Sequence, residues 1–199
     1  MKKLLVILLA LTCAFAMFSC EGQTAANKKT GSIKDFEKAI EETNPAAIEV
    51  QITSDTALGS LAASFKTTFA EDGSFVIEGS YEKFNATTEG EVADVKTVVP
   101  VKITCDKSGN YSDGGAFSGS NPAVTGKKLE LSKKLGASIS NDGNVLTATV
   151  KADKTEDVFG VAYATDVILV ITKNEGKIIS YTMEYATDNG SNKIICNYQ

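Results

Sequence analysis

This chain of 199 residues contains no His, no Arg and no Trp. Without His it cannot form a Ser-His-Asp or Cys-His catalytic site, or an H-E-x-x-H zinc site. Without Arg it has no bidentate clamp for a carboxylate or a phosphate. Without Trp it lacks the side chain most enriched at binding hot spots. Walker and Rossmann glycine motifs are missing as well. We therefore predict a protein that is not an enzyme and has no cofactor and no metal site.

Positive charge is scarce, with 20 Lys against 25 acidic residues. Removal of the first nineteen residues, which carry Lys2 and Lys3, would leave a formal charge of −7. Nucleic-acid binding requires clustered basic side chains that face the phosphates. The composition therefore predicts that nucleic acid is not a partner.

The first twenty residues have the pattern of a bacterial export signal. Lys2 and Lys3 give a positive start, and the stretch from Leu4 to Phe18 is apolar except for Thr12. This stretch is shorter than the roughly 20 residues that span a bilayer comfortably. We therefore expect residues 1–19 to be a signal peptide that is removed, not a retained transmembrane helix.

Met17-Phe18-Ser19-Cys20 resembles the lipobox of bacterial lipoproteins. The resemblance implies that Cys20 becomes the first mature residue and carries acyl chains, which would anchor the protein to a membrane. Phe18 departs from the pattern, because a smaller residue is usual at that position. The alternative is cleavage after Ala16 in Ala14-Phe15-Ala16, which would release a soluble protein. Cys13 follows a shorter apolar run and is the poorer candidate.

Residues 20–31 form a polar stretch without a large apolar side chain. As a flexible tether they would span about 17–20 Å, which is enough to lift a domain off a membrane surface. Residues 32–199 are then long enough for one domain with a sizeable core. We expect the protein to be exported and held in the cell envelope, facing the periplasm or the cell surface.

The region from Ser32 to Asn44 predicts a single helix. Ser32 is a candidate N-cap, and Pro45 ends the pattern. Ile33, Phe36 and Ile40 recur at helical spacing, so that they lie on one face. We expect this face to dock on a sheet, and binding to a membrane or a partner is the alternative.

After Pro45 the apolar residues alternate with polar ones, which predicts strands. Turn-forming Asp, Asn and Gly residues separate these runs. Pro100 predicts an edge strand or the start of a strand. The nearly unbroken apolar run from Val167 to Thr172 predicts a central strand. The fold class is therefore mainly β, an antiparallel meander in a sandwich or an unclosed barrel, with one N-terminal helix packed on it. The predicted turns lie at 71–73, 141–144, 174–177 and 188–190.

Two cysteines, Cys105 and Cys196, lie on the apolar phase of predicted strands. Export would place them where a disulfide can form. The alternative is two separate buried thiols that act as small hydrophobes. The sequence leaves both interpretations open.

Two acidic groups could suggest a cation site. Asp106, Ser108 and Asn110 match the first positions of a calcium loop, but Tyr111 replaces the required Gly. The expected role of this group is a turn. A second group, which comprises Glu89, Glu91 and Asp94, is expected to be a solvated loop.

The order of elements, an anchored helix followed by a long antiparallel meander, is similar to that of the periplasmic lipoprotein-carrier (LolA-like) group. That resemblance implies an unclosed barrel that shelters acyl chains. It rests on no signature residue, and the typical Arg of the family's lid has no counterpart here. The chain also resembles the many small secreted bacterial lipoproteins that have no known activity.

Three functions follow in order of preference. The first is a non-catalytic envelope lipoprotein that acts as an interaction or structural module. The second is a carrier or sensor of an amphiphilic ligand, which would need a cavity between sheet and helix. The third is an enzyme based on carboxylates. A cavity lined by Phe36, Phe65, Phe75 and Leu169 would favour the second, whereas a filled core favours the first.

Overall fold

The computed structural model describes residues 33–86, 92–115, 125–126, 128–132, 135 and 138–199. These residues form nine strands and two α-helices, and the strands build one unclosed antiparallel sheet. The predicted mainly-β meander is confirmed. The strands are β1 (Ala47–Thr56), β2 (Gly59–Phe69), β3 (Phe75–Ala86), β4 (Val92–Cys105), β5 (Ser138–Asn141), β6 (Val145–Val150), β7 (Val167–Asn174), β8 (Lys177–Thr187) and β9 (Gly190–Tyr198).

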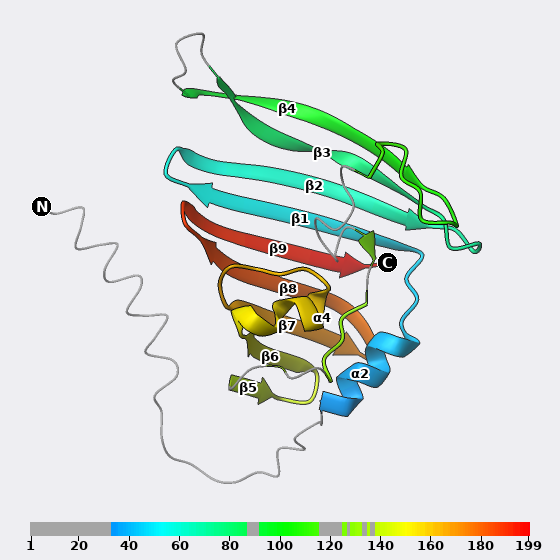
Figure 1. Cartoon of the computed structure of the whole chain (residues 1–199). Helices are drawn as coiled ribbons and strands as arrows, with labels where there is room; N and C mark the ends of the chain where they lie inside the picture. Colours follow the sequence, from blue (N-terminus) through cyan, green and yellow to red (C-terminus); the bar gives the residue numbers. More distant parts are fainter. Residues whose placement is uncertain (1–32, 87–91, 116–124, 127, 133–134, 136–137) are drawn as a thin grey trace, which may run out of the picture.

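The sheet consists of two meanders that join in the middle. Its order is β4-β3-β2-β1-β9-β8-β7-β6-β5, so that the first and the last strand are neighbours (Figure 1). Ile48 on β1 faces Tyr198 on β9, and the pairing continues to Thr56 and Gly190. We call β1–β4 the first half and β5–β9 the second half. The chain leaves one edge after β4 and resumes at the opposite edge with β5.

Tight turns connect the strands within each half. The predicted turns at 71–73, 141–144, 174–177 and 188–190 each join two neighbouring strands. Between β7 and β8, Glu175 has φ 50° and Gly176 has φ 80°. Two consecutive residues with positive φ are what a two-residue hairpin needs to match the twist of its strands.

The helix α2 (Ile33–Glu42) packs on the second half of the sheet. Phe36, Ala39 and Ile40 are buried, as the helical spacing predicted. The predicted N-cap, Ser32, lies outside the described residues. Just past the last turn, the Thr43 hydroxyl donates to the Ala39 carbonyl at 2.6 Å and accepts the Ile178 N–H at 2.9 Å. This buried hydroxyl ties the end of the helix to β8.

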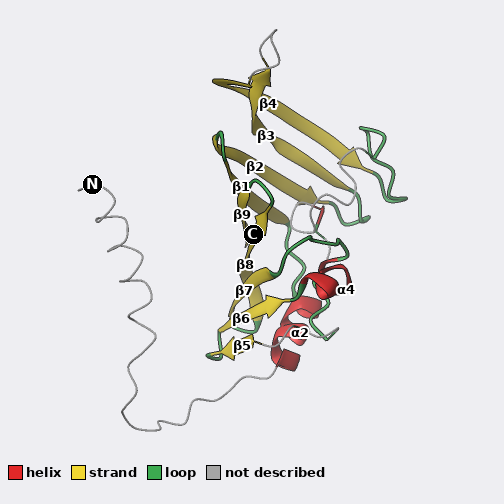
Figure 2. Cartoon of the chain, turned by 60° about the vertical axis from the view of Figure 1, so that its left-hand side comes forward, coloured by secondary structure: helices red, strands yellow, loops and turns green. Residues whose placement is uncertain are grey.

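A second helix, α4 (Thr155–Phe159), follows a 3₁₀ turn (Ala152–Lys154). It ends at Gly160, which adopts the left-handed conformation with φ 70°, as expected of a glycine that ends a helix. The buried Thr155 hydroxyl donates to the Ala152 carbonyl and accepts the Tyr163 N–H. Figure 2 shows α2 and α4 on the same side of the sheet, beside the strands of the second half. We call this side the inner face.

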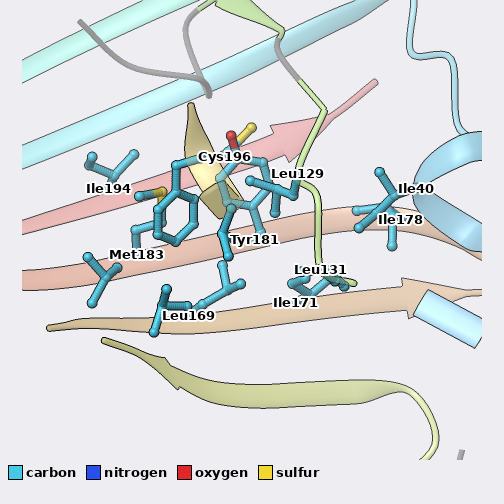
Figure 3. Packing of buried hydrophobic residues seen from close by; sticks show 14 of the residues in the cluster. Ile40, Leu129, Leu131, Leu169, Ile171, Ile178, Tyr181, Met183, Ile194 and Cys196 are labelled. Carbon is cyan, nitrogen blue, oxygen red and sulfur yellow. The ribbon is translucent and has the colours of Figure 1, made fainter. Parts of the chain in front are cut away.

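The core lies between the inner face and these covering segments. Leu169 and Ile171 on β7 are 0% exposed, and β7 is an interior strand flanked by β6 and β8. Leu129 and Leu131, which come from the chain between β4 and β5, lie over the same strands (Figure 3). The prediction that β7 belongs to the core is confirmed. In the described residues, no helix has the length and apolar character needed to cross a membrane.

Candidate functional site

The predicted lipidation site, Cys20, lies outside the described residues, as do the signal peptide and the tether. The same holds for Glu89 and Glu91 of the second acidic group and for the side chain of Asp94. These predictions stay predictions.

Cys105 and Cys196 are buried free thiols. They lie on β4 and β9, with three strands between them in the sheet. The structure therefore does not bring them together, and the alternative of separate buried thiols describes both. Burial raises the pKa of Cys196 to about 12, and it raises the pKa of Cys105 too. Both thiols stay protonated at neutral pH, which makes them poor nucleophiles and poor metal ligands.

The stretch from Asp106 to Asn110 is a turn. Asp106 Oδ1 accepts the N–H groups of Ser108 and Asn110 at 2.8 and 2.9 Å, and its Oδ2 accepts the Asn110 side-chain amide at 2.9 Å. These hydrogen bonds, led by the Asn110 amide, lower the pKa of Asp106. The carboxylate oxygens thus hold the loop's own backbone, as in an Asx turn. Among the described residues, no group of His, Cys, Asp and Glu side chains could hold a metal ion.

The four residues proposed to line a cavity contribute to the core. Phe36, Phe65 and Leu169 are buried members of one contact cluster. Phe75 is partly buried and packs against it, with ring centroids 5.9 Å from Phe69 and 6.0 Å from Tyr111. Large aromatic and branched side chains that interdigitate in this way fill an interior at close-packed density. The filled core itself stays a prediction.

A pocket of about 510 Å³ lies beside this core, at the C-terminal end of α2. Its apolar lining comes from α2, β1, β2 and β9. Its polar residues come from the α2–β1 connection, the β2–β3 turn and residue 128. The principal lining residues are Ile40, Thr43, Asn44, Ile48, Phe69, Glu71, Gly126, Lys128 and Tyr198.

Among the described residues, Lys128 is the cation that lines this pocket. Its Nζ donates to the Glu41 carbonyl at 2.9 Å and to Asn44 Oδ1 at 3.3 Å, so that the ammonium caps the C-terminal end of α2. Burial raises the pKa of Tyr198 above its ordinary value. Its hydroxyl therefore stays protonated and can donate a hydrogen bond. Apolar walls with a few convergent polar groups and this volume are typical of small-ligand sites.

Gly126 shows how closely the pocket wall is packed. It has φ 70°, and a Cβ on it would collide with the ring of Phe69. The sequence did not predict this pocket, because its lining residues are distant in the chain and the residue types carry no motif. The only local signal is Gly126, followed by two lysines.

A second candidate surface is the free edge of the first half. Val95 and Val98 on β4 are 63% and 61% exposed, the highest values among the large hydrophobic residues described. Tyr81 on β3 and Leu58 in the β1–β2 turn are exposed in the same half. Val95 and Val98 thus leave apolar side chains exposed on both faces of the edge strand, and exposed apolar residues on an unpaired edge are typical of a protein–protein contact.

Comparison with known proteins adds no family to these observations. Neither protein-family models nor curated protein sequences match this chain.

Proposed function

We infer that this chain is a lipid-anchored protein of the bacterial cell envelope, whose β domain is a non-catalytic interaction module. The observation that carries the interaction role is the exposure of Val95 and Val98 on the free edge strand β4, next to a buried core cluster. The anchor is supported by the sequence alone, through Ser19-Cys20 at the end of the apolar run. The acyl chains on Cys20 then tie the module to a membrane that faces the periplasm or the outside.

The anchor is tested by the variant Cys20→Ala. We expect the wild-type chain in the membrane fraction and the variant in the soluble fraction, because two acyl chains suffice for stable anchoring. The matched control is Cys105→Ala, which removes a thiol without touching the signal and leaves the protein in the membrane. Mass spectrometry of the mature N-terminus gives the modification directly. An unmodified chain that begins at Met17 would contradict the proposal.

A second candidate function, a carrier or sensor of an amphiphile, is favoured by one observation. The pocket beside α2 combines apolar walls with Lys128 and the Tyr198 hydroxyl. This set of groups suits a ligand with a short apolar body and an anionic or hydrogen-bond-accepting head. Glu71 at the same pocket disfavours a second negative charge.

Native mass spectrometry of the full chain with added dodecanoate separates the two candidates. The interaction module predicts no stoichiometric adduct. The carrier predicts a one-to-one adduct that is lost in Ala70→Trp, since Ala70 lines the pocket from an exposed position. Thr68→Trp, exposed two residues earlier and outside the pocket lining, is the control and would keep the adduct. An adduct with this dependence would replace the first proposal by the second.

A further inference from the structure

Up to Thr104, the edge strand β4 has a row of outward backbone groups that are not hydrogen-bonded to any described residue. β4 pairs with β3 on one side only, in an unbroken register from Lys96 to Cys105. The direction of its free groups follows from Thr104. The Thr104 N–H donates to Ser112 Oγ at 3.0 Å, and its carbonyl accepts the Ser112 N–H at 2.9 Å. Because backbone groups alternate in direction along a strand, residues 96, 98, 100 and 102 also direct theirs to the free side.

At its C-terminal end, the free edge of β4 already pairs with another segment of the chain. Tyr111 forms a bridge with Cys105 and brings Ser112 against Thr104. Further along, Pro100 occupies an outward position, where its missing N–H costs no bond to β3. The backbone of β4 can therefore pair on its free side at 96, 98 and 102, and Pro100 can still accept a hydrogen bond there.

The side chains of β4 are compatible with a second strand. Val95 on the inner face and Val98 on the opposite face would both be covered by it. Edge lysines usually discourage such pairing, but those on β4 have partners within their own sheet. Lys96 lies 3.2 Å from Glu82, and Lys102 lies 2.8 Å from Glu78. Both glutamates are on β3, so the positive charge of the edge is partly offset.

We propose that β4 pairs antiparallel with β4 of a second copy of this chain, with Val98 facing its own counterpart across the two-fold axis. In this register Lys96 lies opposite Pro100 of the second copy. On the inner face, Val95 lies opposite Val101, and Thr97 lies opposite Val99. Cross-strand pairs of β-branched side chains stabilise a sheet.

The neighbouring register is disfavoured by charge. If the axis passed through Val99, Lys96 would face Lys102 of the second copy, and like charges directly opposite destabilise a strand pair. A register centred on Pro100 would limit the pairing to residues 98–102, because the outward groups of Thr104 are bonded to Ser112, whereas an axis at Val98 allows pairing from 94 to 102. The charge pattern and the occupied end of the strand therefore favour the axis at Val98 over the axes at Val99 and Pro100.

The contact buries a small area, so it forms only where the local concentration of the protein is high. A single pair of strands covers less surface than the roughly 1,200 Å² of a standard interface, and Pro100 withholds one donor in each copy. Association therefore needs a high local concentration, which anchoring in the plane of a membrane provides. This dimer rests on the interaction role proposed above and identifies the partner of the module as a second copy of the chain.

A charge exchange at residue 98 tests the two-fold contact. The full chain is studied in a mild detergent by sedimentation over a concentration series. We expect the mass of the wild-type protein to double at high concentration. Val98→Lys and Val98→Glu each place like charges across the axis, so that each stays monomeric. An equimolar mixture of the two brings opposite charges together and recovers the dimer.

The matched control is Ile168→Lys. Ile168 is 45% exposed on β7, whose two edges are paired with β6 and β8, so this variant dimerises like the wild type. A second measurement does not depend on introduced charge. Val98→Cys, treated with a short thiol cross-linker, gives a covalent dimer, whereas Ile168→Cys does not.

A wild-type chain that stays monomeric at every concentration and gives no Val98→Cys dimer overturns the proposal. Dimers of both charge variants, each alone, also overturn it, because the contact then lies elsewhere. Either result leaves the anchor untouched, since Cys20→Ala tests that by fractionation.

Discussion

The strands β4 and β7 are both rich in valine and isoleucine, yet their side chains lie in different environments. On β7, Leu169 and Ile171 are fully buried. On β4, Val95 and Val98 are more than half exposed. The difference comes from position and face: Leu169 and Ile171 lie on the inner face of a strand with two neighbours beside the helices, whereas β4 has one neighbour and lies far from the helices, and Val98 is on the opposite face. Apolar content alone does not determine burial in this fold.

The largest effect that separates the two halves is expected in the core of the second half. Leu169→Ala or Ile171→Ala leaves a cavity among fully buried neighbours and should lower the free energy of unfolding by about 2–5 kcal/mol. Val95→Ala on β4 should change it by less than about 0.5 kcal/mol, as is usual for exposed positions. Urea denaturation measures both. Equal losses at the two sites would show that the halves do not differ in this way.

In the first half of the sheet, the backbones of β2 and β3 nevertheless lie close together. Gly79 on β3 tests how close they are. A Cβ on Gly79 would collide with the Ser64 carbonyl oxygen and come 2.8 Å from Phe65 Cα. Gly79→Ala should therefore destabilise the protein by about 1–3 kcal/mol, as overpacking does. The control is Ser80→Ala at the next position, which should have little effect. An unchanged stability for Gly79→Ala would show that β2 and β3 can move apart freely.

A smaller effect of opposite sign is expected within the core. The Tyr181 hydroxyl is buried, and among the described residues it has no hydrogen-bond partner beyond a weak interaction with the Cys196 thiol. The nearby Cys196 thiol is only a weak hydrogen-bonding group. Tyr181→Phe removes this poorly paired hydroxyl and keeps the ring, so that we expect a gain of about 1 kcal/mol in thermal denaturation. A loss of stability would reveal a partner for the hydroxyl, such as a buried water.

The smallest effect concerns the acid stability of the first half. The Ala62 N–H at 2.9 Å and Lys96 at 3.2 Å bind the Glu82 carboxylate and lower its pKa below the ordinary value of 4.5. A group with a lowered pKa in the folded state stabilises the protein above its unfolded pKa, and this contribution is lost as the pH falls. Glu82→Gln should therefore flatten the stability profile below about pH 4.5. An identical profile for the variant would contradict this role.

Features of the fold that depend on residues close in the sequence could be predicted from the sequence. The Ile33, Phe36 and Ile40 stripe predicted the buried face of α2, because helical periodicity is local. The Asp, Asn and Gly turns predicted the hairpins, and Pro100 predicted an edge strand or a strand start, because these residue preferences are local as well. The turn at Asp106 could also be predicted, because an Asp side chain accepts a hydrogen bond from the backbone two residues ahead.

Features that depend on contacts between distant segments of the chain could not be predicted from the sequence. Nothing in Ile48 or Tyr198 indicates that β1 and β9 pair. The exposure of Val98 depends on which strands flank β4, and its residue type argues for burial. The pocket beside α2 escaped prediction because Ile40, Lys128 and Tyr198 meet only after folding.

The seam between β1 and β9 also has a consequence for the order of events during biogenesis. The partners Ile48 and Tyr198 are 150 positions apart, whereas each meander is joined by short hairpins. Folds dominated by such distant contacts form slowly. Each meander can form from local contacts, but the seam must wait until β9 has been synthesised. Until the seam closes, β1 and the newly made β9 expose unpaired edges, and these edges are the positions where a chaperone would protect the chain from aggregation.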